Sequence, residues 1–218
     1  MTTPTIHITP SSRSEPRRTY SPVECAFRWC SPFEENELIP AVSVFVSQKA
    51  FIRFCAHAGS DLENEVGGWL VGKWCEDKKT KRQFVVVESI LSAPHVRHGG
   101  TFLTFTQDTQ VELYSQLMQR YPGRELVGWY HTHPKMSVFF SSYDAWLHEN
   151  FFPQIHQVAL VIEPYTAAGG FFIRQLDGTL DTRRYFGFYE LHNRSNRSVV
   201  HWRNVFPDQE IQQEDSEE

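Results

Sequence analysis

Two histidines and an aspartate stand at a spacing that could hold one metal ion. The run GWYHTHP places His131 and His133 two residues apart, and Ser141 and Asp144 follow at a fixed distance. Residues 126–133 are typical of a buried strand, and alternate residues of a strand share a face, so we expect both imidazoles to point the same way. The run SSYDAWLHEN then favours a helix with Ser141 as its N-cap and Asp144 in its first turn. A carboxylate from a second element is thereby brought toward the histidine pair.

This donor set matches a catalytic zinc better than a structural one. A catalytic zinc is held by three protein ligands and keeps its fourth position for water, whereas structural sites are closed by four ligands. The ion lowers the pKa of that water to about 7, but a general base must still take its proton and deliver it to a leaving amine. Upstream, Glu65 comes shortly before Trp69, Leu70 and Val71, which are typical of a strand. Glu65 is therefore the candidate base, and one Zn²⁺ is the predicted cofactor.

Simpler explanations exist for each part of the pattern. SxxD is also the spacing of a capping box, so Ser141 and Asp144 could merely begin a helix. A single histidine at the end of a strand is more often a hydrogen-bonded structural residue than a ligand. Neither explanation accounts for the joint occurrence of Glu65, GWYHTHP and SxxD. The combination favours the catalytic interpretation.

Taken together, Glu65 with GxLxG after it, then GWYHTHP and SxxD, resemble the JAMM family of zinc metalloproteases, also called MPN+. The resemblance extends from about Val42 to about Arg174. It implies the cytidine-deaminase-like α/β fold of that family, with a central, mostly antiparallel sheet flanked by helices. It also implies a zinc-dependent isopeptidase or peptidase that acts at the C-terminus of ubiquitin or of a ubiquitin-like protein. It suggests a compact, prokaryotic member of the family.

The resemblance also implies a role for each residue of the motif. His131, His133 and Asp144 would bind the zinc, and Glu65 would be the general acid and base. Ser141 would donate a hydrogen bond to the oxyanion of the tetrahedral intermediate, a role that needs a fixed donor beside the metal. Ser141 thus has two candidate roles, helix cap and oxyanion donor. The sequence does not show how one hydroxyl performs both.

One position of the motif departs from many family members, which have serine where this chain has Thr132. We expect its side chain to face away from the metal, without loss of activity. Residues 135–140 match the family's gap in length but not in composition, which leaves the substrate preference open. Two other functions also stay open. The chain could bind ubiquitin-like partners without cleaving them, or it could be a hydrolase that trims a sulfur-carrier protein.

Length and composition exclude several classes of protein. The 218 residues, 40% of them hydrophobic, suffice for one substantial core. A net charge of −5 provides no basic field for nucleic acid. No stretch is long and apolar enough to cross a membrane, and the first residues contain no hydrophobic signal core. We therefore expect a cytoplasmic protein.

The composition divides the chain into three parts. Residues 1–38 are polar and rich in proline, and we expect a flexible arm; residues 39–192 would be the catalytic domain, and residues 193–218 a polar, acidic tail. Three aromatic side chains interrupt the polar arm: Phe27, Trp29 and Phe33. They suggest a segment that docks on the domain, on a partner or on a second copy.

Periodicity predicts the elements that must position the motif. Helices are expected at residues 48–57 and 107–121. Strands are expected at residues 42–46, 69–71, 84–91, 158–162, 171–173 and 185–189. The apolar face of the second helix would carry Val111, Tyr114, Met118 and Tyr121. Residues 92–106 would form either a loop that accepts the substrate's C-terminal tail as an added strand or an ordinary hairpin.

Overall fold

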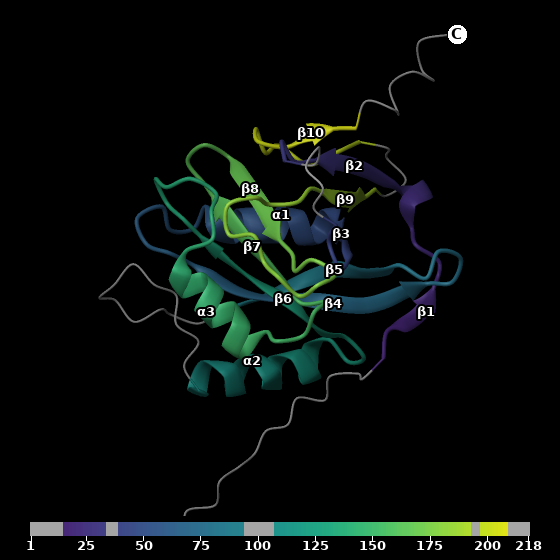
Figure 1. The fold of residues 1–218 in the computed structure, drawn as a ribbon. Coiled ribbons are helices and arrows are strands. Elements are labelled where there is room, and N and C mark those ends of the chain that lie inside the picture. Colours follow the sequence, from purple (N-terminus) through teal and green to yellow (C-terminus); the bar gives the residue numbers. More distant parts are fainter. Residues whose placement is uncertain (1–14, 34–38, 94–106, 193–196, 209–218) are drawn as a thin grey trace, which may run out of the picture.

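A curled, mixed sheet of ten strands forms the centre of the computed structural model, which describes residues 15–33, 39–93, 107–192 and 197–208 (Figure 1). The strand order is β10-β2-β9-β3-β5-β4-β6-β7-β8, and β1 pairs with β4 outside this path. Five of the nine pairings are antiparallel and four are parallel. The predicted α/β fold, with a sheet in which antiparallel pairings are the majority, is confirmed.

The strands and helices follow one another along the chain in a mixed order. The strands are β1 (Arg17–Thr19), β2 (Ala26–Cys30), β3 (Ser43–Ser47), β4 (Gly67–Asp77), β5 (Gln83–Ser92), β6 (Glu125–Thr132), β7 (Val158–Glu163), β8 (Ala168–Phe172), β9 (Phe188–Leu191) and β10 (Phe206–Pro207). The helices are α1 (Gln48–Ala58), α2 (Gln107–Arg120) and α3 (Ser142–Phe151), with a short 3-10 helix, η1, at Val23–Cys25.

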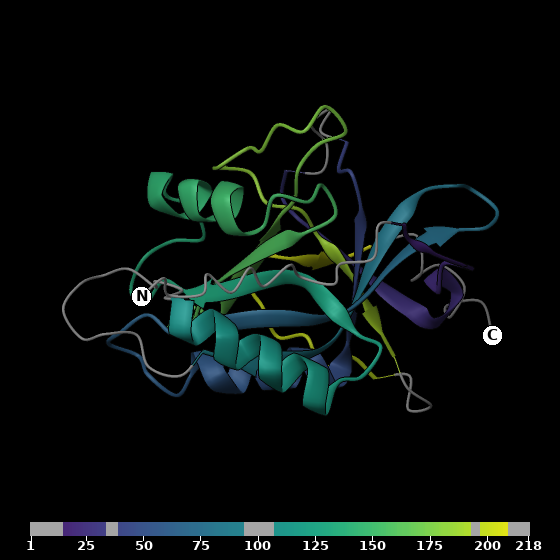
Figure 2. The same ribbon diagram turned by 90° about the horizontal axis from the view of Figure 1, so that it is seen from below.

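Alternate residues of the central strands divide between two cores, one on each face of the sheet. In β7, Val158, Leu160 and Ile162 pack in the core that α1 covers, whereas Ala159 and Val161 pack in the core that α2 and α3 cover. Figure 2 shows α1 and α3 on opposite sides of the sheet. Because both faces are buried, β7 is a continuous apolar run rather than an alternating one.

The first helix begins at a serine cap and buries one apolar face. The Oγ of Ser47 accepts a hydrogen bond from the Ala50 amide at 3.2 Å. Phe51 and Phe54 are fully buried against the sheet, and each contributes roughly 1.5–3 kcal/mol by leaving water. The helix predicted at residues 48–57 is therefore confirmed, with one further residue at its end.

The face predicted for the second helix is partly wrong. Val111 and Met118, expected to be buried, are 43% and 69% exposed. Leu113 and Leu117, which lie four residues apart, are buried instead, and Tyr114 packs beside them as expected. Apolar residues occur around much of this helix, so its periodicity alone admits two faces. Contact with the sheet selects the leucine pair.

The predicted boundaries at residues 38 and 192 also differ from the structure. The segment expected to be a flexible arm contributes β1 and β2, and β2 pairs with β9. The segment expected to be a polar tail contributes Trp202 and Val205 to the core beside α1. Strand β10, in the same segment, pairs with β2. These pairings join residues near the two ends of the chain, which local composition does not reveal. The remaining residues of both segments lie outside the described part.

The three aromatic residues of the predicted arm contact the domain itself. The Trp29 indole donates a hydrogen bond to Glu190 at 3.1 Å. The Phe33 ring meets the Tyr185 ring edge-on at 5.1 Å between centroids, and Phe27 lies 4.9 Å from His192. Docking on the domain was one of the predicted roles for this segment.

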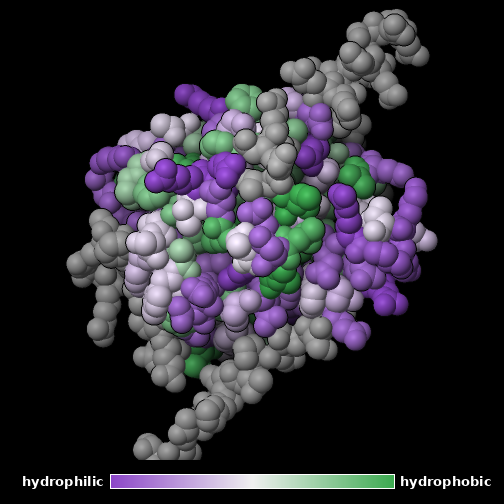
Figure 3. All heavy atoms as spheres, in the orientation of Figure 1, coloured by the Kyte–Doolittle hydropathy of each residue, from purple (hydrophilic) through white to green (hydrophobic). Residues whose placement is uncertain are grey.

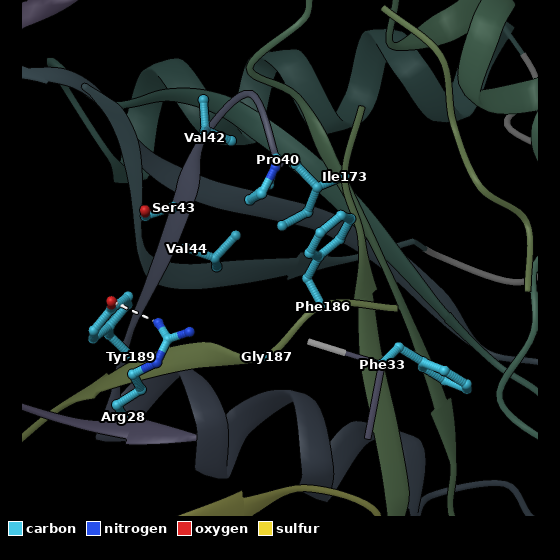
Figure 4. Close-up of a pocket in the computed structure, with 10 residues that line it drawn as sticks. All are labelled: Arg28, Phe33, Pro40, Val42, Ser43, Val44, Ile173, Phe186, Gly187 and Tyr189. Carbon is cyan, nitrogen blue, oxygen red and sulfur yellow. Dashed lines mark hydrogen bonds between the residues drawn. The ribbon is translucent and has the colours of Figure 1, made fainter. Parts of the chain in front are cut away.

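A hollow of about 120 Å³ lies where β2 and β9 meet the first residues of β3 (Figure 4). Its lining is largely apolar and includes Val44 and Phe186. At its margin the Arg28 guanidinium donates a hydrogen bond to the Tyr189 hydroxyl at 2.6 Å, and its Nε lies 3.3 Å from Asp208. The hollow shares no residue with the histidine and aspartate group described below.

Hydrophilic side chains cover most of the face seen in Figure 3, with apolar side chains in small groups between them. In the part of the chain that the structure describes, no helix combines the length and the apolar character needed to cross a membrane.

Candidate metal centre

Strand β6 and helix α3 bring two imidazoles and one carboxylate to a single buried point. The Nε2 atoms of His131 and His133 are 3.0 Å apart. His131 Nε2 lies 3.2 Å from Asp144 Oδ1, and His133 Nε2 lies 3.6 Å from Asp144 Oδ2. The three side chains are 0%, 3% and 6% exposed, and their donor atoms all lie within 4.8 Å of one another. The predicted meeting of these three residues is confirmed.

The strand orients the first histidine by packing its ring. His131 stacks on Trp129 with centroids 4.7 Å apart and planes 10° apart, which places it on the face of β6 that α3 covers. Gly128 allows β6 to approach β7 closely, because a Cβ there would lie 2.0 Å from the Val158 carbonyl oxygen. The small residue at the start of GWYHTHP is therefore required by the strand that presents the ligands.

A buried tryptophan and histidine, which the sequence did not single out for this purpose, fix the helix beside the strand. The Trp129 indole nitrogen donates a hydrogen bond to His148 Nδ1 at 3.0 Å, and His148 is 1% exposed. Burial lowers the pKa of His148 to about 3, so the ring is neutral and can accept this bond. The sequence feature that could have identified His148 is its position, because it lies one turn after Asp144 and on the same face of α3.

Ser141 and Asp144 form a complete capping box at the start of α3. Ser141 Oγ accepts from the Asp144 amide at 3.1 Å, and Asp144 Oδ2 accepts from the Ser141 amide at 2.7 Å. The simple explanation of SxxD as a helix start is therefore correct, and it does not exclude the ligand role. One carboxylate serves the helix and also approaches both histidines.

The charge states of His131 and Asp144 are those that a metal ion needs. Burial lowers the pKa of His131, and the neighbouring carboxylate only partly offsets this, so the imidazole is neutral near pH 7. Burial raises the pKa of Asp144, but hydrogen bonds with His131 and His133 outweigh it and hold the pKa well below its usual range. Neutral imidazoles and an ionised carboxylate are the ligand forms that bind metals.

The geometry of the three donors fits a zinc ion. Ligand distances of about 2.0–2.2 Å around a tetrahedral zinc separate neighbouring donor atoms by roughly 3.4 Å. The separations of 3.0, 3.2 and 3.6 Å between the donors bracket that value. With three protein donors, a fourth tetrahedral position remains for a small molecule.

Glu65 lies just before β4, beside the end of the ligand-bearing strand. The pairing of β4 with β6 places Gly67 opposite His131. The next pair is made by Val66 and Thr132, which share two hydrogen bonds of 2.9 Å. Glu65 is the residue before Val66, and His133 is the residue after Thr132, so both lie directly beyond this last contact between the two segments. Glu65 is partly buried.

The predicted substrate loop at residues 92–106 lies almost wholly outside the described residues.

The chain is similar in sequence to several known proteins. A family model described as "JAB1/Mov34/MPN/PAD-1 ubiquitin protease" matches residues 40–155. The chain is 23% identical over 141 residues to the 26S proteasome non-ATPase regulatory subunit 14 of Caenorhabditis elegans, covering 64% of this chain and 44% of that protein. It is 25% identical over 130 residues to the ubiquitin carboxyl-terminal hydrolase RPN11 of Saccharomyces cerevisiae, covering 59% of this chain and 40% of that protein.

The matched region thus spans less than half the length of both relatives. The solution structure of protein DSY2949 from Desulfitobacterium hafniense aligns with a TM-score of 0.47 at 23% identity, covering 65% of this chain and 90% of that one. The family match covers β6 with His131, the next residue but one, His133, the whole of α3 and the segment of Glu65.

Proposed function

The chain belongs to the JAB1/Mov34/MPN/PAD-1 family, and from that premise we propose that it is a zinc-dependent isopeptidase or peptidase that cleaves after the C-terminus of ubiquitin or a ubiquitin-like protein. The observation that carries the proposal is the buried convergence of His131, His133 and Asp144. Two relatives that share the matched region are named for the proteasome and for ubiquitin hydrolysis.

In this proposal His131, His133 and Asp144 hold the zinc. When bound, zinc would polarise the scissile carbonyl and lower the pKa of a water molecule to about 7. The remaining catalytic steps belong to Glu65 and Ser141. They concern the movement of one proton and the stabilisation of one oxygen atom.

Glu65 takes a proton from the attacking water and returns it to the departing amine. The role requires a carboxylate beside the metal ligands, and the two hydrogen bonds between Val66 and Thr132, the neighbours of Glu65 and of both histidines, support it. General acid–base catalysis of this kind contributes roughly 10²–10⁴-fold to a rate.

Ser141 donates a hydrogen bond to the oxygen of the scissile carbonyl as charge develops there. Its capping role is no obstacle, because the cap uses the hydroxyl oxygen as an acceptor of the Asp144 amide. A serine hydroxyl has two acceptor lone pairs and one proton to donate, so the two roles use different parts of the group. The two candidate roles that compete in the sequence are thereby compatible.

The test is Glu65→Gln in the zinc-loaded protein, assayed with ubiquitin carrying a C-terminal fluorogenic amide and with a lysine-linked ubiquitin dimer. We expect stoichiometric zinc and an unchanged fold, with cleavage reduced by roughly 10²–10⁴-fold because glutamine cannot accept the proton. Full activity in this variant would end the assignment of Glu65.

The matched control is removal of the metal. A chelator should abolish cleavage by the wild type, and added zinc should restore it. Stoichiometric zinc and ubiquitin binding without turnover would instead identify a binding protein. Cleavage only of a sulfur-carrier protein with extra residues at its C-terminus would identify the other alternative, a hydrolase that trims such proteins.

A further inference from the structure

Both backbone groups of the residue after Glu65 are held by Thr132, which lies between the two histidine ligands. The Thr132 amide donates to the Val66 carbonyl oxygen at 2.9 Å, and the Val66 amide donates to Thr132 Oγ1 at 2.9 Å. Thr132 is 0% exposed. In a regular antiparallel ladder a backbone carbonyl would accept from the Val66 amide. Here a side-chain hydroxyl takes that place and extends the pairing of β4 and β6 by one step.

The consequence concerns Glu65, the candidate proton carrier of the site. Glu65 lies one peptide bond from this contact and precedes the first residue of β4. Without the hydroxyl, the Val66 amide would lose its partner, and the bond from the Thr132 amide to the Val66 carbonyl oxygen would alone extend the pairing beyond Gly67 and His131. The hydroxyl therefore doubles the contacts that hold the residue next to Glu65. It lies at the end of β6, between His131 and His133.

We propose that Thr132 is a positioning residue that fixes Glu65 beside the metal ligands through its hydroxyl. The proposal rests on the proposed function, since it gives Glu65 a reaction to serve. Thr132 touches neither substrate nor metal in this scheme. It acts on the rate only through the place of the Glu65 carboxylate.

A second contact, between Lys135 and Glu63, also holds the segment that precedes β4, and we expect its contribution to be small. Lys135 Nζ lies 2.7 and 2.8 Å from the two carboxylate oxygens of Glu63, and the Tyr165 hydroxyl donates to Glu63 at 3.0 Å. The Lys135 and Glu63 side chains are 56% and 71% exposed. Exposed ion pairs contribute little, because water competes for both charges. The Thr132 hydroxyl is shielded from water, so losing it leaves the Val66 amide without a replacement partner, and Thr132 is the stronger anchor.

The chain offers a matched pair of substitutions at this position. Thr132→Val keeps the branched shape and removes the hydroxyl. Thr132→Ser keeps the hydroxyl and removes a methyl group. If Thr132 acts by packing, Thr132→Ser should lower activity more. If it acts by positioning Glu65, Thr132→Val should lower activity more. Lys135→Met serves as a control at the weaker contact.

The kinetic test compares these variants as zinc-loaded full-length protein on the fluorogenic ubiquitin amide. We expect Thr132→Val to lower kcat on the order of 10²-fold, as misplacement of a catalytic group by about 1 Å does, with little change in KM or in zinc content. Thr132→Ser and Lys135→Met should remain close to the wild type. Wild-type kcat in Thr132→Val would overturn the proposal. Loss of zinc in Thr132→Val would also overturn it, because Thr132 would then support the two histidines rather than Glu65.

A second readout is independent of activity. Amide hydrogen exchange at Val66 should accelerate in Thr132→Val and stay slow in Thr132→Ser. If the wild type cleaves none of the ubiquitin substrates, the proposed function fails, and the exchange contrast still decides whether the hydroxyl holds this segment. Equal exchange in the two variants would overturn the anchor even in an active enzyme.

Discussion

Two helices of this protein begin at a serine cap, and only one of these caps belongs to the metal centre. At α1, Ser47 accepts from the amide of Ala50, three residues later; at α3, Ser141 accepts from the amide of Asp144 at the same spacing. The distances are 3.2 and 3.1 Å. As starts of helices, the two sites are nearly equal.

The difference lies in the third helical residue. Ala50 is fully buried in the core and does nothing further for the cap. Asp144 accepts from the Ser141 amide and also approaches His131 and His133. Because α1 begins well with alanine at this position, the helix start alone does not require the carboxylate of Asp144. What distinguishes Asp144 is its contact with the two histidines, so its role in the cap and its proposed role as a metal ligand can be tested separately.

The largest effect is expected from Asp144→Asn, which removes the charge and nearly preserves the shape. Zinc content should fall to background and cleavage with it, because a neutral amide is a poor replacement for a carboxylate ligand of zinc. The helix should persist, since the amide oxygen can still accept from the Ser141 amide. Elemental analysis, cleavage assays and circular dichroism measure the three outcomes. Wild-type zinc content in this variant would show that Asp144 only caps the helix and does not bind the metal.

An intermediate effect is expected from Ser141→Ala. Removal of an oxyanion donor lowers kcat by roughly 10²–10³-fold, while zinc content should be unchanged. Loss of the cap should also lower the free energy of unfolding by about 1 kcal/mol, measured by urea denaturation. A stability loss with unchanged kcat would show that Ser141 is only a cap.

The smallest effect is expected from Ser47→Ala, which makes the same chemical change at the other helix. The free energy of unfolding should again fall by about 1 kcal/mol, because the cap of α1 is lost. Cleavage per folded molecule should not change. A fall in kcat as large as that of Ser141→Ala would mean that the kinetic effect follows from lost stability, and the contrast between the two caps would disappear.

The parts of the site that the sequence predicted are close together along the chain. His131, His133 and Asp144 lie within 14 positions, where strand alternation and a capping signal act locally. Their convergence could therefore be inferred before any packing was known. The link between Trp129 and His148 could not, because an indole and an imidazole in an apolar surrounding have many alternative partners.

The parts that the sequence missed depend on pairings between distant residues. Strand β2 was placed in a flexible arm because its neighbours are polar, yet it pairs with β9. Trp202 was placed in a polar tail, yet it is 4% exposed beside α1. The contact of Thr132 with Val66 links residues 66 positions apart, and the expectation that Thr132 has no functional consequence rested on its direction alone. Composition describes a segment but does not identify its partner in the sheet.

The buried carboxylate of Glu190 joins residues that are synthesised at widely separated times. This side chain is 0% exposed and accepts hydrogen bonds from the Trp29 indole, the Gln48 amide group and the Val199 amide. Trp29 and Glu190 are 161 residues apart. At about 5–20 residues per second, a ribosome needs on the order of ten seconds to make the intervening chain. During that time the backbone groups of β2 that pair with β9 have no partner. Strand β2 is thus made early, but it can join the sheet beside β9 only after nearly the whole chain has been made.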